Sequence, residues 1–528
     1  MRIPLSVLEF RDRAAALFGN VEAVIDGERR FTYAQYAERT HRMANALRGL
    51  GVQPGDRVTF ISYNCHQLLE AYYGVLEAGA VLNPVNIRLA PPEIGYILDH
   101  AGTTAVFYHA DFRPMVEALR PGLPAVEAWV VLEGPIEGPA THEYEALLAR
   151  ASPAYEAPEV DEDAMAELFY TSGTTGRPKG VVLTHRNLYL HALDSALALR
   201  VTDADTMLHV VPLFHVNGWG APHWMTLVGG RHVMLRKFDA GALLRLVAEH
   251  GVTYLLGVPT IFNAVVNSAE LGEHDLSSLK VALIGGSPAS PTLVRTIEEK
   301  LGCQAIVGYG LSETTPILSL AWPRAALTAA EAPEMAAARQ AMTGYAIAGV
   351  NLRVVDQDGA DVRPDGEQIG EIVARSNTVM DGYYGDPEGT AEKIRDGWFH
   401  TGDMATIDEA GYILIKDRSK DIIIRGGENI SSVEIENAFA SHPAVLEVAV
   451  VAAPDDRWGE VPVALVVLKP DAAATPQELR THVRTQLADF KVPRMIEFRD
   501  ALPKGGTGKV LKAELREPFW AGRAARVN

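Results

Sequence analysis

Short runs of β-branched and aliphatic residues, each followed by an amphipathic segment, recur through most of this 528-residue chain. Residues 58–61 form one such run, and residues 68–78 after it have helical spacing. Strands that alternate with helices build largely parallel sheets with helices on their faces, so we expect an α/β fold. For any single run a buried helix fragment is the alternative. Further strands are expected at residues 81–82, 105–108, 129–132, 233–235, 254–256, 281–284 and 305–307.

The pattern changes after about residue 345. Residues 352–356 and 370–374 alternate apolar and polar side chains near Asp-Gly turns, which predicts antiparallel β structure. A separate α+β unit is expected from Asp421 onward. Its elements are a strand at residues 422–424, a helix at 433–441 and strands at 447–451 and 461–468.

Composition excludes several classes of protein. With 48% hydrophobic and 22% charged residues, the chain is globular and is neither disordered nor collagen-like. Its 67 Asp and Glu against 48 Lys and Arg give a net charge of −19, which argues against broad binding to nucleic acid or anionic membranes. Cys65 and Cys303 form no CxxC pair, and no apolar stretch is long enough for a membrane span. The N-terminus lacks a signal-peptide core, so we expect a cytoplasmic protein.

The segment at residues 170–181 reads Tyr-Thr-Ser-Gly-Thr-Thr-Gly-Arg-Pro-Lys-Gly-Val. Glycines let backbone amides approach phosphate oxygens, hydroxyls donate hydrogen bonds, and Lys179 adds a positive charge. By composition alone the segment is also compatible with a flexible connector. The Gly-x-x-x-x-Gly-Lys-[Ser/Thr] pattern of P-loop NTPases occurs nowhere in the chain.

The segment resembles the phosphate loop of adenylate-forming enzymes, which include acyl-CoA synthetases, luciferases and peptide-synthetase adenylation domains. Five further segments resemble motifs of that family, in the family's order across residues 30–515. They are residues 212–215 (Pro-Leu-Phe-His), 308–314 (Gly-Tyr-Gly-Leu-Ser-Glu-Thr), 398–403 (Trp-Phe-His-Thr-Gly-Asp), 417–421 (Asp-Arg-Ser-Lys-Asp) and 503–509 (Pro-Lys-Gly-Gly-Thr-Gly-Lys). Ser312 replaces the usual threonine, and Lys420 stands where many members carry aspartate.

The resemblance implies the fold of adenylate-forming enzymes. We expect a large N-terminal lobe of βα sheets with a β-rich subdomain at residues 1–416. A hinge at residues 417–420 is expected to connect it to a small, mobile α+β C-terminal domain at residues 421–528.

The resemblance also implies how ATP is bound. Glu313, with Thr171 nearby, is expected to bind Mg²⁺, a hard ion that prefers oxygen ligands. Asp403 is expected to accept hydrogen bonds from both ribose hydroxyls, and Gly286, Ser287 and Tyr309 to flank adenine. The full set expected to bind ATP or AMP is Thr171, Ser172, Gly173, Thr174, Thr175, Gly176, Lys179, Gly286, Ser287, Gly308, Tyr309, Gly310, Leu311, Ser312, Glu313, Thr314, Asp403, Arg418, Lys420 and Lys509.

Lys509 is the residue expected to catalyse adenylation, by bridging the carboxylate substrate and the α-phosphate. Rotation of the small domain about Lys420 is then expected to withdraw Lys509. The same rotation is expected to present the CoA-binding residues Gly426, Gly427 and Asn429, whose glycines leave room for pantetheine.

The remaining expected site is the acyl pocket. His215 is expected to close it behind the carboxylate or to gate the thiol path, and so joins Lys509 and Glu313 as a catalytic candidate. Trp219 is expected to shape or gate the tunnel. The acyl-binding set is His215, Trp219, Val258, Gly285, Gly286 and Gly308.

The function that the resemblance implies is AMP-forming ligation of a carboxylic acid to CoA, with ATP and CoA as co-substrates and Mg²⁺ as cofactor. The substrate expected first is a medium- or long-chain fatty acid, and the subgroup also implies a homodimer. A short or functionalised acid, such as methylthiopropionate or an aryl acid, is the alternative. From other classes, a P-loop-like kinase or NTPase and a non-catalytic nucleotide or acyl sensor stay open.

Overall fold

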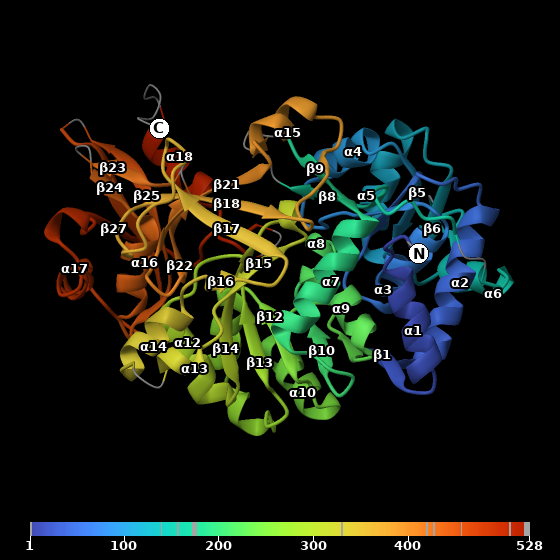
Figure 1. Ribbon diagram of the computed structural model, residues 1–528, viewed down its shortest axis with the longest axis horizontal. Helices are drawn as coiled ribbons and strands as arrows, with labels where there is room; N and C mark the ends of the chain where they lie inside the picture. Colours follow the sequence, from blue (N-terminus) through green and yellow to red (C-terminus); the bar gives the residue numbers. More distant parts are fainter. Residues whose placement is uncertain are drawn as a thin grey trace.

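The computed structural model describes residues 3–138, 140–155, 158–171, 177–328, 331–418, 421–425, 428–455, 457–505 and 508–521. Four sheets organise them, and two large sheets of mostly parallel strands form the body of the molecule (Figure 1). The first large sheet has the order β16 (Tyr345–Ala346), β15 (Ile317–Leu320), β14 (Gln304–Gly310), β13 (Val281–Ile284), β12 (Tyr254–Gly257), β10 (Thr206–His209), β11 (Arg231–Met234), β1 (Glu22–Asp26) and β2 (Arg29–Thr32).

The second large sheet is parallel from β8 through β7 and ends in an antiparallel edge. Its order is β19 (Gly382–Tyr383), β9 (Lys179–Thr184), β8 (Met165–Thr171), β4 (Val81–Pro84), β3 (Arg57–Ile61), β5 (Thr103–Tyr108), β6 (Ala128–Val131) and β7 (His142–Glu143). The segment predicted to bind phosphate connects β8 to β9, and Thr171 pairs with Lys179 at the end of the hairpin next to it.

Helices pack between the large sheets and over their outer faces. A single hydrophobic core contains side chains from both sheets and from α1, α2, α3, α7 and α9. These helices are α1 (Leu8–Phe18), α2 (Tyr33–Gly49), α3 (His66–Glu77), α7 (His185–Leu199) and α9 (Ala221–Val228). The others of this part are α4 (Pro91–His100), α5 (Arg113–Leu119), α6 (Tyr144–Arg150), α8 (Val216–Trp219), α10 (Ala240–His250), α11 (Pro259–Val266), α12 (Pro291–Leu301), α13 (Ala325–Thr328), α14 (Pro333–Gln340) and α15 (Pro387–Lys393).

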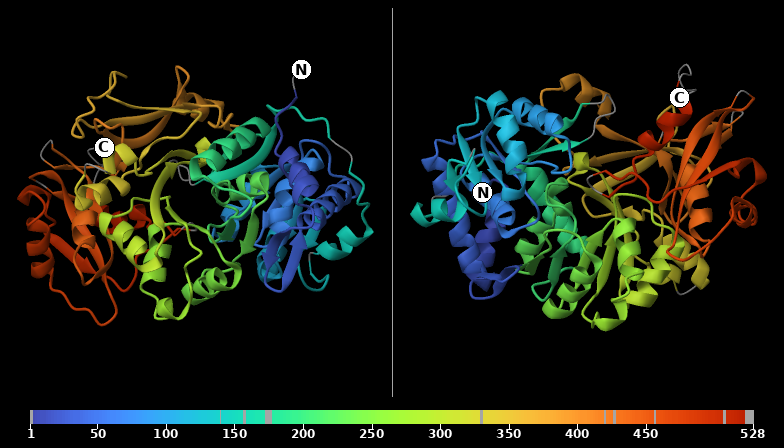
Figure 2. Two further views of the ribbon diagram at one scale, coloured as in Figure 1. Left: turned by 60° about the horizontal axis from the view of Figure 1, so that its bottom comes forward. Right: turned by 180° about the vertical axis from the view of Figure 1, so that it is seen from behind.

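Two smaller sheets complete the chain, and both views in Figure 2 place them side by side. An antiparallel sheet contains β17 (Val350–Val355), β18 (Gly370–Ser376), β21 (Trp398–Ile407), β20 (Ile394–Arg395) and β22 (Ile413–Arg418). The last sheet contains β24 (Glu428–Ile430), β23 (Ile423–Arg425), β26 (Gly459–Leu468), β25 (Val445–Asp455) and β27 (Met495–Phe498). Helices α16 (Ser432–Ala440), α17 (Pro476–Arg484) and α18 (Lys512–Trp520) accompany it.

Local sequence signals explain where several helices begin and end. Thr32 caps α2 in a reciprocal pair with Gln35: its hydroxyl accepts from the Gln35 amide at 3.3 Å, and its own amide donates to Gln35 Oε1 at 2.9 Å. Helix α12 begins with Ser290 as cap and Pro291 at its first position, and ends at Gly302 with φ +69°. These side chains satisfy backbone groups that every helix end leaves unpaired.

The expected mixed α/β architecture, with a large first part and a smaller last part, is confirmed. All the strands predicted from apolar runs are strands in the structure, and the helix predicted at residues 433–441 is α16. The alternating segments after residue 345 are the antiparallel pair β17 and β18. Among the described residues no helix combines the length and apolar character needed to cross a membrane.

Candidate active site

The expected site residues gather where parallel strands of the two large sheets end. Thr171 is the last residue of β8, Val258 follows β12, and Gly285 follows β13. Residues 308–310 close β14. Parallel strands end at one edge of their sheet, and ligands of such folds bind outside that edge. The structure thereby brings together segments that are more than 100 residues apart in sequence.

Lys509 reaches this edge from the C-terminal part of the chain. A methyl group built on Gly286 would lie 3.2 Å from Lys509 Cε and 3.2 Å from Val258 Cγ1. The loop before Lys509 also touches the large lobe, because the Thr260 hydroxyl donates to the Gly508 carbonyl at 3.4 Å. The loop closes on itself through a 2.8 Å bond from the Gly505 amide to the Lys509 carbonyl. The end of the Lys509 side chain therefore lies against Gly286, among the residues expected to form the acyl pocket.

His215 lies beside Lys509 and is uncharged at neutral pH. Burial, reinforced by the positive charge of Lys509, lowers the pKa of His215 to about 3. The imidazole therefore presents a neutral ring to the site and adds no second cation beside Lys509. A neutral imidazole donates a hydrogen bond from one ring nitrogen and accepts one at the other.

The indole of Trp219 lies against the Gly285–Gly286 segment. A methyl group on Gly285 would lie 2.9 Å from Trp219 Cη2, and one on Gly286 would lie 3.5 Å from Trp219 Cζ2. Gly286 also has φ +78°, so it needs glycine for its backbone as well as for this contact. The indole is 7% exposed. The whole acyl-binding set therefore converges: Gly308 contributes its carbonyl oxygen, which would lie 3.4 Å from a methyl on Gly285, while a methyl on Gly308 itself would face the core side chains Leu283 and Leu320.

Glu313 sits on the short 3₁₀ helix η4 (Ser312–Thr314) directly after β14. The Tyr383 hydroxyl donates to Glu313 Oε1 at 2.9 Å, and the Met380 amide donates to the Glu313 carbonyl at 2.8 Å. Gly310 lets the backbone after η4 return close to β14, because a methyl on Gly310 would lie 1.7 Å from the Pro316 carbonyl oxygen. The position of Glu313 is therefore fixed by hydrogen bonds from Tyr383 and Met380.

Lys179 forms an ion pair that the sequence did not indicate. Its ammonium lies 2.8 Å from Asp386 Oδ2 and 4.9 Å from the centre of the Tyr383 ring. Asp386 also caps α15, because its other oxygen accepts from the Gly389 amide at 2.8 Å. The positive charge and hydrogen bonds lower the pKa of Asp386, which keeps the pair ionised. Lys179, Tyr383 and Glu313 therefore form one connected group.

Asp403, the expected ribose ligand, is 3% exposed and lies in β21. The Tyr309 hydroxyl donates to Asp403 Oδ2 at 2.7 Å. This contact joins two residues expected at the nucleoside, one in the 308–314 motif and one in the 398–403 motif. It also connects the small antiparallel sheet that contains β21 to the edge of the first large sheet.

The segment around the expected hinge is held by ionic and polar contacts on both sides. At its first residue, Asp417 Oδ2 accepts from the Ser432 amide at 2.8 Å, and burial raises the pKa of Asp417. After it, Asp421 pairs with Arg516 at 2.8 Å. Lys512, one helical turn before Arg516, pairs with Glu436 at 2.7 Å.

Several predicted site residues lie outside the described part of the chain. They are Ser172, Gly173, Thr174, Thr175, Gly176, Lys420, Gly426 and Gly427, together with the side chains of Arg418 and Asn429. Ser287, Leu311, Ser312 and Thr314 are described and lie in or next to the segments above.

The oxygen donors present suit Mg²⁺ bound with phosphate. Within the described ranges no group of three or more His, Cys, Asp and Glu side chains could hold a metal ion unaided. Mg²⁺ is typically held by one or two carboxylates together with substrate phosphates and water. Glu313, whose Oε2 has no role in the Tyr383 bond, fits that requirement.

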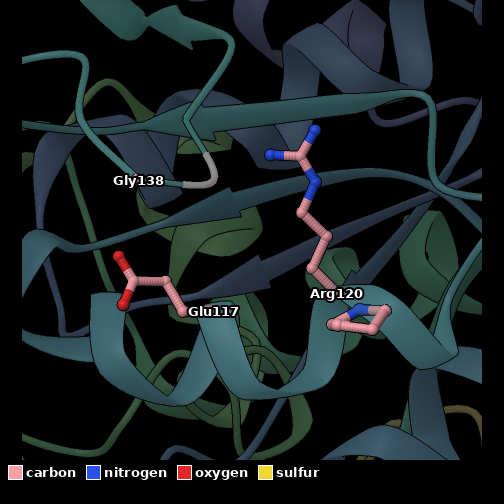
Figure 3. A pocket seen from close by; sticks show the side chains of 4 residues that line it. Glu117, Arg120 and Gly138 are labelled. Atoms are coloured by element: carbon pink, nitrogen blue, oxygen red, sulfur yellow. The ribbon is translucent and has the colours of Figure 1, made fainter.

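A surface hollow of about 450 Å³ lies elsewhere on the molecule (Figure 3). It is lined by Glu117, Arg120, Pro121 and Gly138. None of the residues expected to act on a substrate lines it, and its side chains offer no nucleophile.

Sequence reasoning missed Tyr383 and Asp386. The Asp-Pro pair at residues 386–387 is a helix-start signal that the sequence does display. Its meaning for the site depends on the pairing of β19 with β9, which brings Tyr383 opposite Val181. No local pattern reports that contact.

Comparisons with known proteins agree with this geometry. The model of the family "AMP-binding enzyme" matches residues 11–384, and the model "AMP-binding enzyme C-terminal domain" matches residues 434–509. The chain is 41% identical to a long-chain-fatty-acid–CoA ligase of Thermus thermophilus, over 98% of this chain and 96% of that protein. It is 37% identical to a 3-methylmercaptopropionyl-CoA ligase of Ruegeria lacuscaerulensis, over 98% of each. The structure resembles that of the anthranilate CoA ligase AuaEII in complex with anthranoyl-AMP, with a TM-score of 0.91, 28% identity and 98% of each chain covered.

Proposed function

Because the chain belongs to the family of AMP-binding enzymes, we propose that it is an AMP-forming acyl-CoA ligase whose substrate is a medium- or long-chain fatty acid. The observation that carries this proposal is the position of Lys509. Its Cε lies against Gly286, among the pocket residues and beside His215, although Gly286 and Lys509 are 223 residues apart. An ammonium group there can contact both a bound carboxylate and an α-phosphate.

In the first half-reaction a carboxylate oxygen attacks the α-phosphorus of ATP, the bond to the bridging oxygen breaks, and pyrophosphate leaves. The negative charge that develops must be met by donors already in place. Lys509 supplies a cation at the acyl side, and Lys179 supplies one at the end of the phosphate segment, once it exchanges Asp386 for phosphate. The neutral ring of His215 leaves the carboxylate nucleophilic, because it adds no competing charge.

Mg²⁺ is proposed as the cofactor, held by Glu313 with Thr171 nearby. When bound it neutralises charge on the phosphates. Tyr383 keeps the Glu313 carboxylate oriented toward that role through its 2.9 Å hydrogen bond.

For the second half-reaction we propose that residues 1–416 and 421–528 are the two domains and that they rotate about a hinge at residues 417–420. The thiol of CoA attacks the acyl carbonyl, the carbon–oxygen bond to AMP breaks, and AMP leaves. Rotation about Lys420 would remove Lys509 and bring Gly426, Gly427 and Asn429 to the site. At the two ends of this segment, Asp417 bonds to the Ser432 amide and Asp421 pairs with Arg516, so both ends are attached to the proposed small domain.

A short or functionalised acid is the second candidate substrate. Trp219 fills the space in front of Gly285 and Gly286, which favours a compact acyl group while the indole holds this position. The likeness to a 3-methylmercaptopropionyl-CoA ligase supports the same alternative. A cytoplasmic location and a homodimer remain part of the proposal, and sedimentation of the purified protein tests the latter.

The experiment that tests the function measures all products with ATP, CoA and a panel of acids. Fatty acids from C2 to C18, aryl acids and methylthiopropionate are compared. We expect equal amounts of AMP, pyrophosphate and acyl-CoA, with the highest kcat/KM for a medium- or long-chain acid. Formation of ADP, or ATP turnover independent of any acid, would contradict the ligase proposal and favour a kinase or NTPase.

A further inference from the structure

The residues that follow His215 form a left-handed turn. Val216, Asn217, Gly218, Trp219 and Gly220 have φ values of 32°, 43°, 52°, 62° and 82°. L-residues other than glycine adopt this region singly and at a cost, so a run of five is not stable without outside support. The turn carries Trp219, whose indole contacts the Gly285–Gly286 segment. A contact that stabilises the turn therefore also fixes Trp219 beside the expected acyl pocket.

One buried carboxylate holds it from two sides. Asn217 Nδ2 donates to Glu167 Oε2 at 3.0 Å, and His223 Nε2 lies 2.8 Å from Glu167 Oε1. Glu167 and Asn217 are fully buried and His223 is 1% exposed. Among the described residues neither Asn217 Oδ1 nor His223 Nδ1 has a hydrogen-bond partner. Glu167 therefore fixes both side chains by hydrogen bonds: that of Asn217 within the turn, and that of His223 just after it, in α9.

Glu167 itself is rigidly placed. It lies in β8, opposite Leu82 of β4 and Leu183 of β9, near the middle of the second large sheet. It is four residues before Thr171, where the phosphate segment begins. A charged group without partners at this depth would be strongly unfavourable, so its two oxygens need Asn217 and His223 as much as the turn needs the carboxylate.

We propose that Glu167 is a positioning residue that, through Asn217 and His223, holds Trp219 against Gly285 and Gly286 and thereby sets which acyl chains the site accepts. This rests on the proposed ligase function. Glu167 touches neither substrate nor Lys509 in this account; it acts through the shape of the turn. Relaxing the turn frees the indole and changes the acyl pocket, while the hydrogen bond from Tyr309 to Asp403, at the expected nucleoside site, stays as it is.

Four variants separate positioning from a merely structural role. Glu167→Ala removes both contacts, and Glu167→Gln keeps one acceptor oxygen and offers an amide donor of the same size. Glu70→Ala is the matched control, because Glu70 is also a fully buried carboxylate, bonded to Arg39 and Tyr144 on the far side of α3. Asn217→Ala removes only one arm and serves if Glu167→Ala does not fold.

The kinetic assay measures KM and kcat for acids from C4 to C16 and for ATP. We expect Glu167→Ala to raise the KM for its best acid roughly tenfold, the discrimination that a hydrophobic pocket attains per methylene, and to flatten the chain-length profile. The KM for ATP should not change, and Glu167→Gln should restore the profile. A wild-type profile in Glu167→Ala or Asn217→Ala, or an equal change in Glu70→Ala, would overturn the proposal.

A readout independent of catalysis separates this inference from the proposed function. Acrylamide quenching is measured for each variant with and without Trp219→Phe, so that the difference reports Trp219 alone. Quenching of Trp219 should increase in Glu167→Ala and stay at the wild-type value in Glu70→Ala. Unchanged quenching in Glu167→Ala would refute the positioning role, whether or not the wild-type protein makes acyl-CoA.

Discussion

Gly286→Ala tests whether the observed position of Lys509 is the one that supports adenylation. The new methyl group would lie 3.2 Å from Lys509 Cε, whereas carbon atoms pack best at about 3.5–4.0 Å. Lys509 must therefore retreat by roughly 0.3–0.8 Å, because Val258 Cγ1, also at 3.2 Å, blocks movement of the methyl in the other direction.

The size of the effect follows from that displacement. A misplacement of 1 Å in a catalytic group costs about 100-fold in rate, so half an ångström predicts roughly a tenfold fall in adenylation. Alanine at φ +78° also adds about 1–2 kcal/mol of backbone strain, which lowers the stability of the protein independently of any displacement of Lys509. Gly302→Ala is the control for strain, because Gly302 has φ +69° and nothing lies within 4 Å of its added methyl.

The assay measures each half-reaction separately: pyrophosphate release with acid and ATP, and thioester formation from supplied acyl-adenylate and CoA. Gly286→Ala should lose about tenfold in the first and far less in the second, and Gly302→Ala should lose neither. Both variants should lose a similar amount of stability. Adenylation by Gly286→Ala at the rate of Gly302→Ala, or equal loss of both half-reactions, would refute the reasoning.

Three further predictions follow from single contacts. Tyr383→Phe removes the 2.9 Å hydrogen bond to Glu313 and should raise the Mg²⁺ concentration for half-maximal activity by about tenfold, which corresponds to the free energy of a hydrogen bond to a charged group. Tyr384→Phe is the control, and an equal increase in both variants would contradict the role of Tyr383. Asp386→Asn keeps the cap on α15 but releases Lys179, so the KM for ATP should fall by up to about fivefold, whereas a rise would show that the pair assists binding. Burial lowers the pKa of His185 to about 4 and the pKa values of His191, His209 and His215 to about 3, from an ordinary value of 6.5. Below pH 6.5 the unfolded chain therefore binds protons that the native protein does not. The free energy of unfolding, measured in urea, should fall by about 1.4 kcal/mol per histidine per pH unit as the pH drops toward 4, offset in part by His66, whose pKa is raised beside Asp26. A free energy of unfolding that is independent of pH in this range would refute the assignment of neutral buried histidines.

The parallel sheets were predictable from the sequence for a physical reason. A strand buried on both faces must be apolar throughout, so residues 254–257 and 281–284 display their burial directly in composition. The motif residues were identified by their resemblance to a family, and their role in binding phosphate stays a prediction. Lys509, His215 and Gly286 were expected in one site, and the structure places them together.

Contacts between segments that are remote in sequence could not be predicted. The pair Lys179–Asp386 joins residues 207 positions apart, and each alone resembles an ordinary surface charge or helix cap. Glu167 lies within an apolar run, where a lone carboxylate gives no indication of its partners on α8 and α9. The left-handed turn was equally hidden: Asn217, Gly218 and Gly220 are residue types that adopt positive φ, but Val216 and Trp219 between and beside them are not.

The central claim is that a carboxylate forms an acyl-adenylate before it meets CoA, and the fate of the carboxylate oxygen tests it most directly. The protein is incubated with a fatty acid labelled with oxygen-18 in its carboxyl group, ATP and CoA, and the nucleotide product is analysed by mass spectrometry. Attack of the carboxylate on the α-phosphorus leaves one labelled oxygen in the phosphate of AMP when the thiol displaces it. The account predicts that label in AMP; unlabelled AMP, or label in inorganic phosphate with ADP as the nucleotide product, would contradict it.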